Sequence, residues 1–113
     1  MANFKVQRLN EDVKRELTDI LRSVKDPRVD KLLTVVKVDL SGDYSYCKVY
    51  VSSLEGMERT RESVKGLESA AGYIRRELCL RVKMRRSPEL HFVADDSIEY
   101  GAEISKKLND LIK

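Results

Sequence analysis

The chain has 113 residues, of which 42% are hydrophobic and 36% are charged. This length suits one domain with a modest core, and the composition favours a compact, well-solvated domain over intrinsic disorder. The apolar runs are far shorter than the roughly 20 residues of a membrane span, and the N-terminus lacks an apolar stretch of signal-peptide length. We therefore expect a single domain over residues 1–113 that is cytoplasmic and has no membrane contact.

The side chains that commonly bind metal ions are few and scattered. Cys47 and Cys79 lie far apart with no C-x-x-C spacing, and His91 is the only histidine. This pattern predicts no zinc site, no cofactor, and two reduced cysteines that behave as small, half-buried hydrophobic residues.

The first helix is predicted from apolar residues at spacings of three and four, which mark one face of an α-helix. These residues are Val6, Leu9, Val13, Leu17, Ile20, Leu21 and Val24. The helix should end before Asp26-Pro27, because proline disfavours a helical residue before it and cannot donate the next hydrogen bond.

Residues 32–40 and 44–52 predict the two strands of a β-hairpin, joined by turn residues at Ser41, Gly42 and Asp43. In the first strand Val36, Val38 and Leu40 should share one face. In the second, Cys47, Val49 and Val51 alternate with Tyr46, Lys48 and Tyr50.

Helical spacing returns at Val64, Leu67, Ala71, Ile74 and Leu78. Gly72 lies inside this stretch, where glycine costs about 1 kcal/mol relative to alanine. The helix is therefore expected to be kinked, or another backbone to approach it closely. We interpret the stretch as two helices that meet at a bend over Ala70, Ala71 and Gly72.

A third strand is predicted at residues 89–94 after Pro88, with Leu90, Phe92 and Ala94 on one face and His91 and Val93 on the other. Asp96 and Glu99 have the spacing of an N-cap and its N3 partner for a last helix. Its apolar positions are Ile98, Ile104, Leu108 and Leu111. The predicted order is helix, strand, strand, helix, helix, strand, helix.

Five segments in this order carry a resemblance to a known family. They are RLNEDVKREL at 8–17, KDPR at 25–28, VDLSGDYSYCKVYVS at 38–52, AAGYIRREL at 70–78 and RRSPELHFVADDS at 85–97. Together they resemble the ribosome-binding factor A family. The resemblance implies an α+β, type II KH-like fold: a three-stranded sheet packed against helices, with an Ala-x-Gly bend in place of the G-x-x-G loop.

The resemblance also implies a function. It implies a non-enzymatic factor that binds free, immature small (30S) ribosomal subunits and assists late maturation of 16S rRNA, including its 5′ end, notably in the cold. We expect the protein to be a monomer. No small-molecule substrate is expected. Since G-x-x-G is absent, we expect contact with structured rRNA rather than single-strand reading by that loop. The chain ends soon after the last predicted helix, so the C-terminal tail of some relatives is not expected.

Basic residues concentrate in one segment. Residues 73–86 contain six of them against the single acid Glu77, a local excess of +5 in a chain of net charge +3. The predicted RNA-binding residues are Arg75, Arg76, Arg81, Lys83, Arg85 and Arg86, with Lys5, Arg8, Arg15 and Arg28 as a possible extension. The alternative is a solvated helix face, and Arg28 could simply fix the exit from the first helix.

Two further groups have functional and structural interpretations. Tyr44, Tyr46 and Tyr50 with Lys48 could stack on RNA bases, although we favour tyrosines that merely cover the outer face of a sheet. Asp95, Asp96 and Glu99 could suggest a small nuclease, but capping explains the last two. A general KH-like nucleic-acid binder that acts outside the ribosome is the main alternative function.

Overall fold

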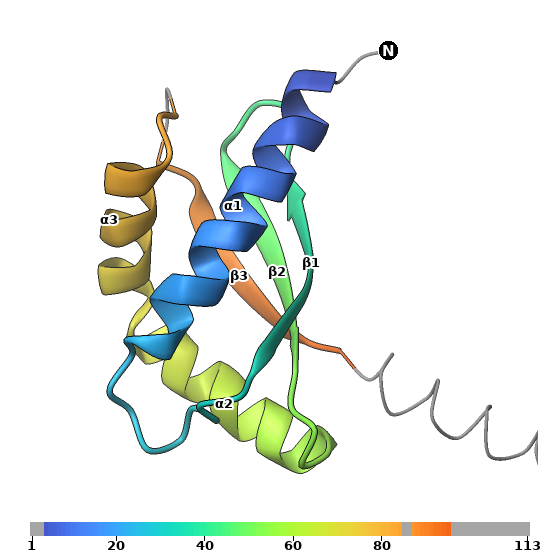
Figure 1. Ribbon diagram of the computed structural model, residues 1–113, viewed down its shortest axis with the longest axis vertical. Coiled ribbons are helices and arrows are strands. Elements are labelled where there is room, and N and C mark those ends of the chain that lie inside the picture. Colours follow the sequence, from blue (N-terminus) through green and yellow to red (C-terminus); the bar gives the residue numbers. More distant parts are fainter. Residues whose placement is uncertain (1–3, 85–86, 96–113) are drawn as a thin grey trace, which may run out of the picture.

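The computed structural model describes residues 4–84 and 87–95, with side chains from residue 7 onward in these ranges (Figure 1). The elements are α1 Phe4–Arg22, β1 Thr34–Leu40, β2 Tyr46–Ser52, α2 Met57–Ser69, α3 Ala71–Arg81 and β3 Glu89–Ala94. Their order confirms the sequence prediction for the first six elements. The predicted last helix lies outside the described residues.

The three strands form one sheet in the order β1-β2-β3. β1 and β2 are antiparallel, whereas β2 and β3 are parallel. A parallel pair needs a crossover connection, and α2 and α3 supply it. All three described helices pack on the same face of the sheet, and no described helix covers the other face (Figure 1).

The core lies between the helices and the covered face of the sheet. The apolar residues that the sequence predicted for one face of each helix or strand supply most of this core, because a helical or alternating pattern puts its apolar side chains on one side of the element. The fully buried apolar residues are Val13, Leu17, Ile20, Cys47, Val49, Val51, Leu67, Ile74 and Leu78. The predicted alternation in β2 and the predicted bounds of β3 are confirmed.

The prediction that Val36 shares the core face of β1 is wrong. Val35, Val38 and Leu40 are buried, and the pairing with β2 shifts between Val35 and Lys37. A β-bulge inserts one extra residue into a strand, which reverses the faces on either side of it. Val36 occupies the bulge and is only half-buried.

The hairpin turn is longer than the sequence suggested, because polar side chains hold it. The Asp43 carboxylate accepts hydrogen bonds from the Ser45 backbone N–H at 3.0 Å and from the Ser41 hydroxyl at 2.8 Å. Tyr44 adopts a φ of 62°, and β2 begins only at Tyr46. Hydrogen bonds from the two serine hydroxyls, chiefly Ser45, lower the pKa of Asp43 to about 2.

The predicted bend between two helices is confirmed, but Gly72 does not cause it. The helical path breaks at Ala70, where φ is −98° and ψ is 9°. Gly72 lies inside α3 without a positive φ, and a Cβ there would meet nothing within 4 Å. The close approach is instead at Gly66 in α2, where a Cβ would lie 2.6 Å from the Val29 Cγ2 atom.

Candidate nucleic-acid interface

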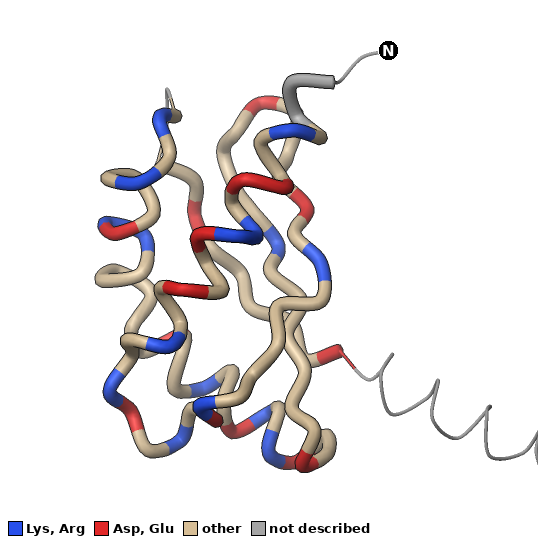
Figure 2. The backbone as a smooth tube through the Cα atoms, viewed as in Figure 1, with Lys and Arg blue, Asp and Glu red and all other residues tan. Residues whose placement is uncertain are grey.

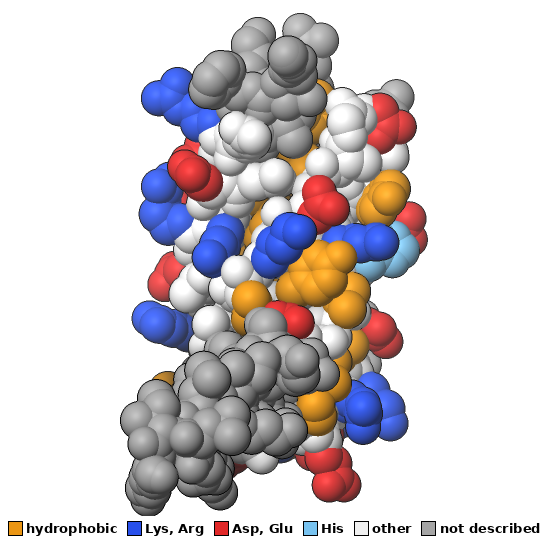
Figure 3. Space-filling view, turned by 90° about the vertical axis from the view of Figure 1, so that its right-hand side faces the viewer, with side chains coloured by type: hydrophobic (Ala, Val, Ile, Leu, Met, Phe, Trp, Pro, Cys, Tyr) orange, Lys and Arg blue, Asp and Glu red, His pale blue; other side chains and the backbone are white. Residues whose placement is uncertain are grey.

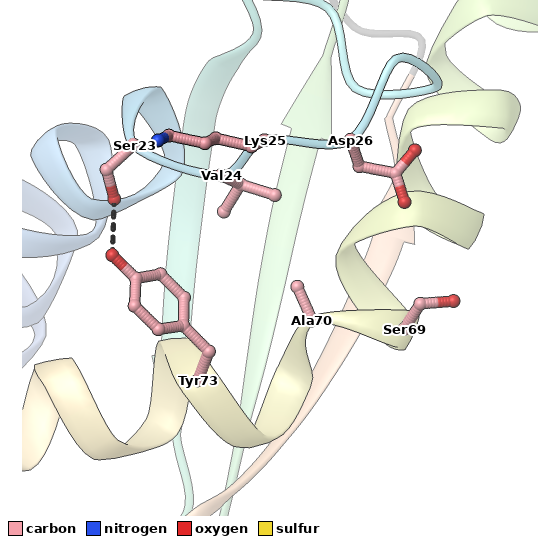
Figure 4. Close-up of a pocket in the computed structure, with 7 residues that line it drawn as sticks. All are labelled: Ser23, Val24, Lys25, Asp26, Ser69, Ala70 and Tyr73. Carbon is pink, nitrogen blue, oxygen red and sulfur yellow. Dashed lines mark hydrogen bonds between the residues drawn. The ribbon is translucent and has the colours of Figure 1, made fainter.

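The bend opens onto a pocket of about 400 Å³ between the end of α1 and the start of α3 (Figure 4). It is lined by Ser23, Val24, Lys25, Asp26, Ser69, Ala70 and Tyr73. The hydroxyls of Tyr73 and Ser23 share a hydrogen bond of 2.8 Å that ties α3 to the end of α1. Val24 and Ala70 point into the space between them (Figure 4). The pocket therefore has an apolar floor and a polar rim.

In the turn after α1, Arg28 holds Asp26, the acidic residue that lines this pocket. Arg28 donates to both carboxylate oxygens of Asp26, at 2.8 and 3.1 Å, and to the Ser69 hydroxyl at 3.0 Å. These hydrogen bonds from Arg28 lower the pKa of Asp26 to about 2. The KDPR segment thus neutralises its own carboxylate and attaches the turn to the end of α2. This supports the interpretation of Arg28 as the residue that fixes the helix exit, and leaves its RNA contact a prediction.

Basic side chains without acidic partners lie around the pocket. Lys25 lines it, and Lys25, Arg22 and Lys31 also line an adjoining groove of about 930 Å³. Arg76 follows Tyr73 by three residues and so lies on the same side of α3. None of these four cations forms an ion pair with a described residue, and all are exposed. Figure 2 shows Lys and Arg positions along α3 and around the turn below α1.

Sequence reasoning missed Arg22, Lys25 and Lys31. It counted charge along the chain, where acids are interleaved with these residues. The fold removes one such acid, Asp26, by pairing it with Arg28, and brings Lys25 beside the bend. The KDPR segment was the available signal, since an Asp and an Arg two residues apart across a proline can pair locally and leave the lysine unpaired.

The predicted cations of the 73–86 segment have different environments. The Arg75 guanidinium donates to the Ser87 hydroxyl at 2.7 Å and to the Ser87 carbonyl, so it braces the segment before β3. Arg76 and Lys83 are exposed and make no ion pair within the described ranges. Arg85 and Arg86 lie outside the described residues.

Arg81 is surrounded by three acids, two of which the local sequence does not reveal. Its guanidinium lies 2.6 Å from Asp19, 3.7 Å from Glu16 and 3.7 Å from Glu77. The hydrogen bond to Asp19 is the main cause of a raised pKa for Arg81. Two of the three acids belong to α1, so the excess of +5 counted along the segment overstates the charge that this part of the surface presents.

The residues predicted as a possible extension of the RNA-binding surface also have different environments. Arg8 is exposed without an ion pair to any described residue, whereas Arg15 lies 3.1 Å from Asp12 and 3.7 Å from Glu16 on its own helix. The Lys5 side chain is outside the described part of the structure.

The remaining candidates, the cysteines and the acidic cluster, lie only partly within the described residues. Across residues 4–84 and 87–95, no three His, Cys, Asp or Glu side chains come together in a way that could hold a metal ion. Cys79 is half-buried as predicted, but the same prediction is wrong for Cys47, which faces the core and is fully buried. Burial raises the pKa of the Cys47 thiol to about 12. The Asp95 backbone N–H donates to the Val51 carbonyl at 2.8 Å, and Asp96 and Glu99 are not described. No helix in the described part is long and apolar enough to cross a membrane.

This architecture defines a class: small α+β domains in which helices cover one face of a three-stranded sheet. The sequence model of ribosome-binding factor A matches residues 5–108. A ribosome-binding factor A from Acetivibrio thermocellus is 46% identical over 107 residues, which is 94% of this chain and 87% of that protein. The chain belongs to the ribosome-binding factor A family.

Solved structures agree with this assignment. The crystal structure of ribosome-binding factor A from Thermus thermophilus is similar with a TM-score of 0.71 and 34% identity, over 80% of this chain and 97% of that one. A homology model of Thermus thermophilus ribosome-binding factor A, fitted into a cryo-EM map of its complex with the 30S subunit, gives a TM-score of 0.68 and 33% identity. That match covers 82% of this chain and 97% of the other.

Proposed function

We propose that this protein binds free, immature small ribosomal subunits and assists late maturation of their 16S rRNA, including the 5′ end, notably in the cold. Its family membership supports this, as does its similarity to a protein fitted into a complex with the 30S subunit. On this proposal it acts in the cytoplasm, as a monomer and as a single domain over residues 1–113, without a cofactor.

The observation that carries the proposal is the set of unpaired cations beside the bend. We define the bend surface as Arg22, Lys25, Tyr73 and Arg76. Arginine and lysine side chains that lack acidic partners can exchange counterions for RNA phosphates, whereas paired ones must first break an ion pair. We propose the other predicted cations, Arg75, Arg81, Lys83, Arg85 and Arg86, as secondary contacts. Among these, Arg81 would first have to leave its acidic partners and Arg75 its hydrogen bonds to Ser87.

The start of α3 lies at the bend, beside these charges. α3 spans 11 residues, and its N-cap residue Ala70 provides no side-chain hydrogen bond to the first turn. Free N–H groups at the start of a helix favour a phosphate there. Lys25 and Ser69 line the same pocket, so a phosphate at the bend would also meet side chains from the turn after α1 and from α2.

The proposed mechanism is differential binding without bond chemistry. A protein that prefers one rRNA conformation shifts the RNA population toward it by the difference in affinity. The relatives' name describes binding factors, which supports this mechanism over catalysis.

Co-sedimentation with purified ribosomal particles tests the proposal. We expect the protein to comigrate with free small subunits, and not with large subunits or whole ribosomes. Equal binding to all particles and to unrelated RNA would favour a general KH-like binder that acts outside the ribosome. RNA cleavage that requires magnesium would contradict the non-enzymatic mechanism.

A further inference from the structure

The uncovered face of the sheet carries a second set of side chains suited to RNA. Opposite the helices, β2 presents Tyr46, Lys48 and Tyr50 in alternation. The register places Lys37 of β1 beside Tyr50 and His91 of β3 beside Lys48. Figure 3 shows a group of hydrophobic side chains on this face, with Lys or Arg on both sides and the histidine at its edge.

Of the two tyrosine rings on this face, that of Tyr46 is exposed and that of Tyr50 is half-buried. Tyr46 is 41% exposed, and its ring meets the His91 ring edge-on with centroids 5.7 Å apart. Tyr46 and Tyr50 are four residues apart on one strand, which is about 13 Å at the usual rise. Two tyrosines at this separation would each hold a different base, with Lys48 between them.

The charges on this face favour an anionic chain that follows β2. Lys37 and Lys48 form no ion pair within the described residues. The Lys37 ammonium lies 5.8 Å from the centre of the Tyr50 ring, an exposed contact that a base could replace at little cost. Two acids also lie on this face: Asp39 of β1 is opposite Lys48 in the register, and Glu89 of β3 is opposite Tyr46 and lies 3.8 Å from His91. The central strand β2 itself presents only aromatic and basic side chains here.

We propose that this sheet face, consisting of Lys37, Tyr46, Lys48, Tyr50 and His91, binds unpaired RNA bases by stacking. Tyrosines that merely cover a sheet need no unpaired lysine between them, whereas alternating rings and cations match the alternating bases and phosphates of single-stranded RNA. This site is separate from the bend surface, since the sheet lies between them, and it does not depend on the ribosomal function proposed above.

Fluorescence anisotropy with a labelled oligouridine of 12 nucleotides tests this site. Tyr46→Thr and Tyr50→Thr keep a β-branched residue in the strand, and each should weaken binding roughly 5- to 150-fold. Tyr46→Phe retains the ring and should bind like wild type.

With two lysines near phosphates, the logarithm of the association constant should fall with log salt with a slope of about −1.4.

Three outcomes would overturn the proposal. They are wild-type affinity in folded threonine variants, equal affinity for a duplex of the same length, and equal loss in Tyr46→Phe. The face would instead belong to a protein partner if the wild-type protein did not bind oligouridine but bound an acidic peptide, and if Tyr46→Phe bound that peptide equally well. This test can fail or succeed separately from the proposed ribosomal function. Arg76 belongs to the bend surface, so Arg76→Ala should leave oligouridine binding unchanged whether or not it weakens binding to small subunits.

Discussion

Gly66 shows at the scale of one residue how the turn after α1 packs on α2. A Cβ at this position would lie 2.6 Å from Val29 Cγ2 and 3.2 Å from Asp26 Cγ, and Val29 is buried. Because the turn is held by the Asp26–Arg28 pair and by Ser63, whose hydroxyl accepts from the Asp30 N–H, it has little room to retreat. Gly66→Ala should therefore reduce the free energy of unfolding by about 1 to 2 kcal/mol, measured by urea denaturation.

Gly72 provides the matched control, since it is exposed in the neighbouring helix. A Cβ there meets nothing within 4 Å and the backbone is helical. Gly72→Ala should stabilise the protein by about 0.5 to 1 kcal/mol, chiefly by lowering the entropy of the unfolded chain. A loss of stability in Gly72→Ala, or no loss in Gly66→Ala, would contradict the packing described at the bend.

The pairing of Asp26 with Arg28 makes stability depend on pH in the acid range. The folded pKa of Asp26 is about 2, below its ordinary value of 3.8, because Arg28 donates hydrogen bonds to the carboxylate. A lowered folded pKa means that the stabilisation is complete above about pH 4 and disappears as the pH falls toward 2. Asp43 loses its stabilisation over the same range, since its folded pKa is also about 2.

The variant Asp26→Asn isolates this contribution. Its melting temperature should lie below that of wild type by a constant amount above pH 5, and the difference should shrink between pH 4 and 2. Asp43 is unchanged in both proteins and so does not affect the difference. A gap that stays constant down to pH 2 would show that the Asp26 carboxylate does not stabilise the fold through its charge.

At the scale of elements, most boundaries were predictable because the relevant signals are local. Apolar spacing predicted α1, α2 and α3, and proline predicted the start of β3. The bulge at Val36 was not predictable, since Val35 and Val36 are equally apolar and only the pairing with β2 selects Val35 for the core. The break at Ala70 lies within the predicted bend over Ala70, Ala71 and Gly72, but its assignment to Gly72 was wrong, since Gly72 is an ordinary helical residue of α3.

Arg81 connects α3 to α1, and its role should differ from that of Arg76. It lies 2.6 Å from Asp19 across the two helices, yet both side chains remain partly exposed. Arg81→Ala should therefore reduce the free energy of unfolding by at most about 1 kcal/mol, as for other exposed ion pairs. A double-mutant cycle with Asp19→Ala measures this interaction directly.

Arg76→Ala is the matched comparison for Arg81→Ala, since it removes an arginine from the same helix. Because Arg76 has no ion pair to a described residue, its removal should leave the melting temperature unchanged and weaken binding to small subunits. If Arg81→Ala weakened subunit binding more than Arg76→Ala did, the unpaired cations would not be the main phosphate contacts.

At the scale of the whole molecule, the candidate site was only partly predictable. The sequence identified the bend and the basic segment after it, because both lie within one continuous stretch. It could not show that α1 brings Asp19 and Glu16 to Arg81, or that the KDPR turn leaves Lys25 beside the bend. Charges that are distant in sequence meet only through tertiary structure, so counting along the chain overestimates some cations and omits others.

The net charge of only +3 means that binding to small subunits should depend on a local surface rather than on overall attraction. If about four or five phosphates are neutralised, log affinity should fall with log salt with a slope of roughly −3 to −4. Replacing Lys25 and Arg76 together by alanine should flatten this slope by roughly 1.5 without changing the melting temperature. The measurement is co-sedimentation with free small subunits at several salt concentrations.

A control with the same change in charge separates the bend surface from the charge of the molecule. Lys14→Ala combined with Arg61→Ala also removes two exposed, unpaired cations, but from parts of α1 and α2 outside the bend surface. This variant should retain the wild-type slope, because counterion release counts the phosphates that are contacted and not the total charge. Equal flattening in both double variants would mean that the subunit responds to overall charge, and the bend surface would then lose its assigned role.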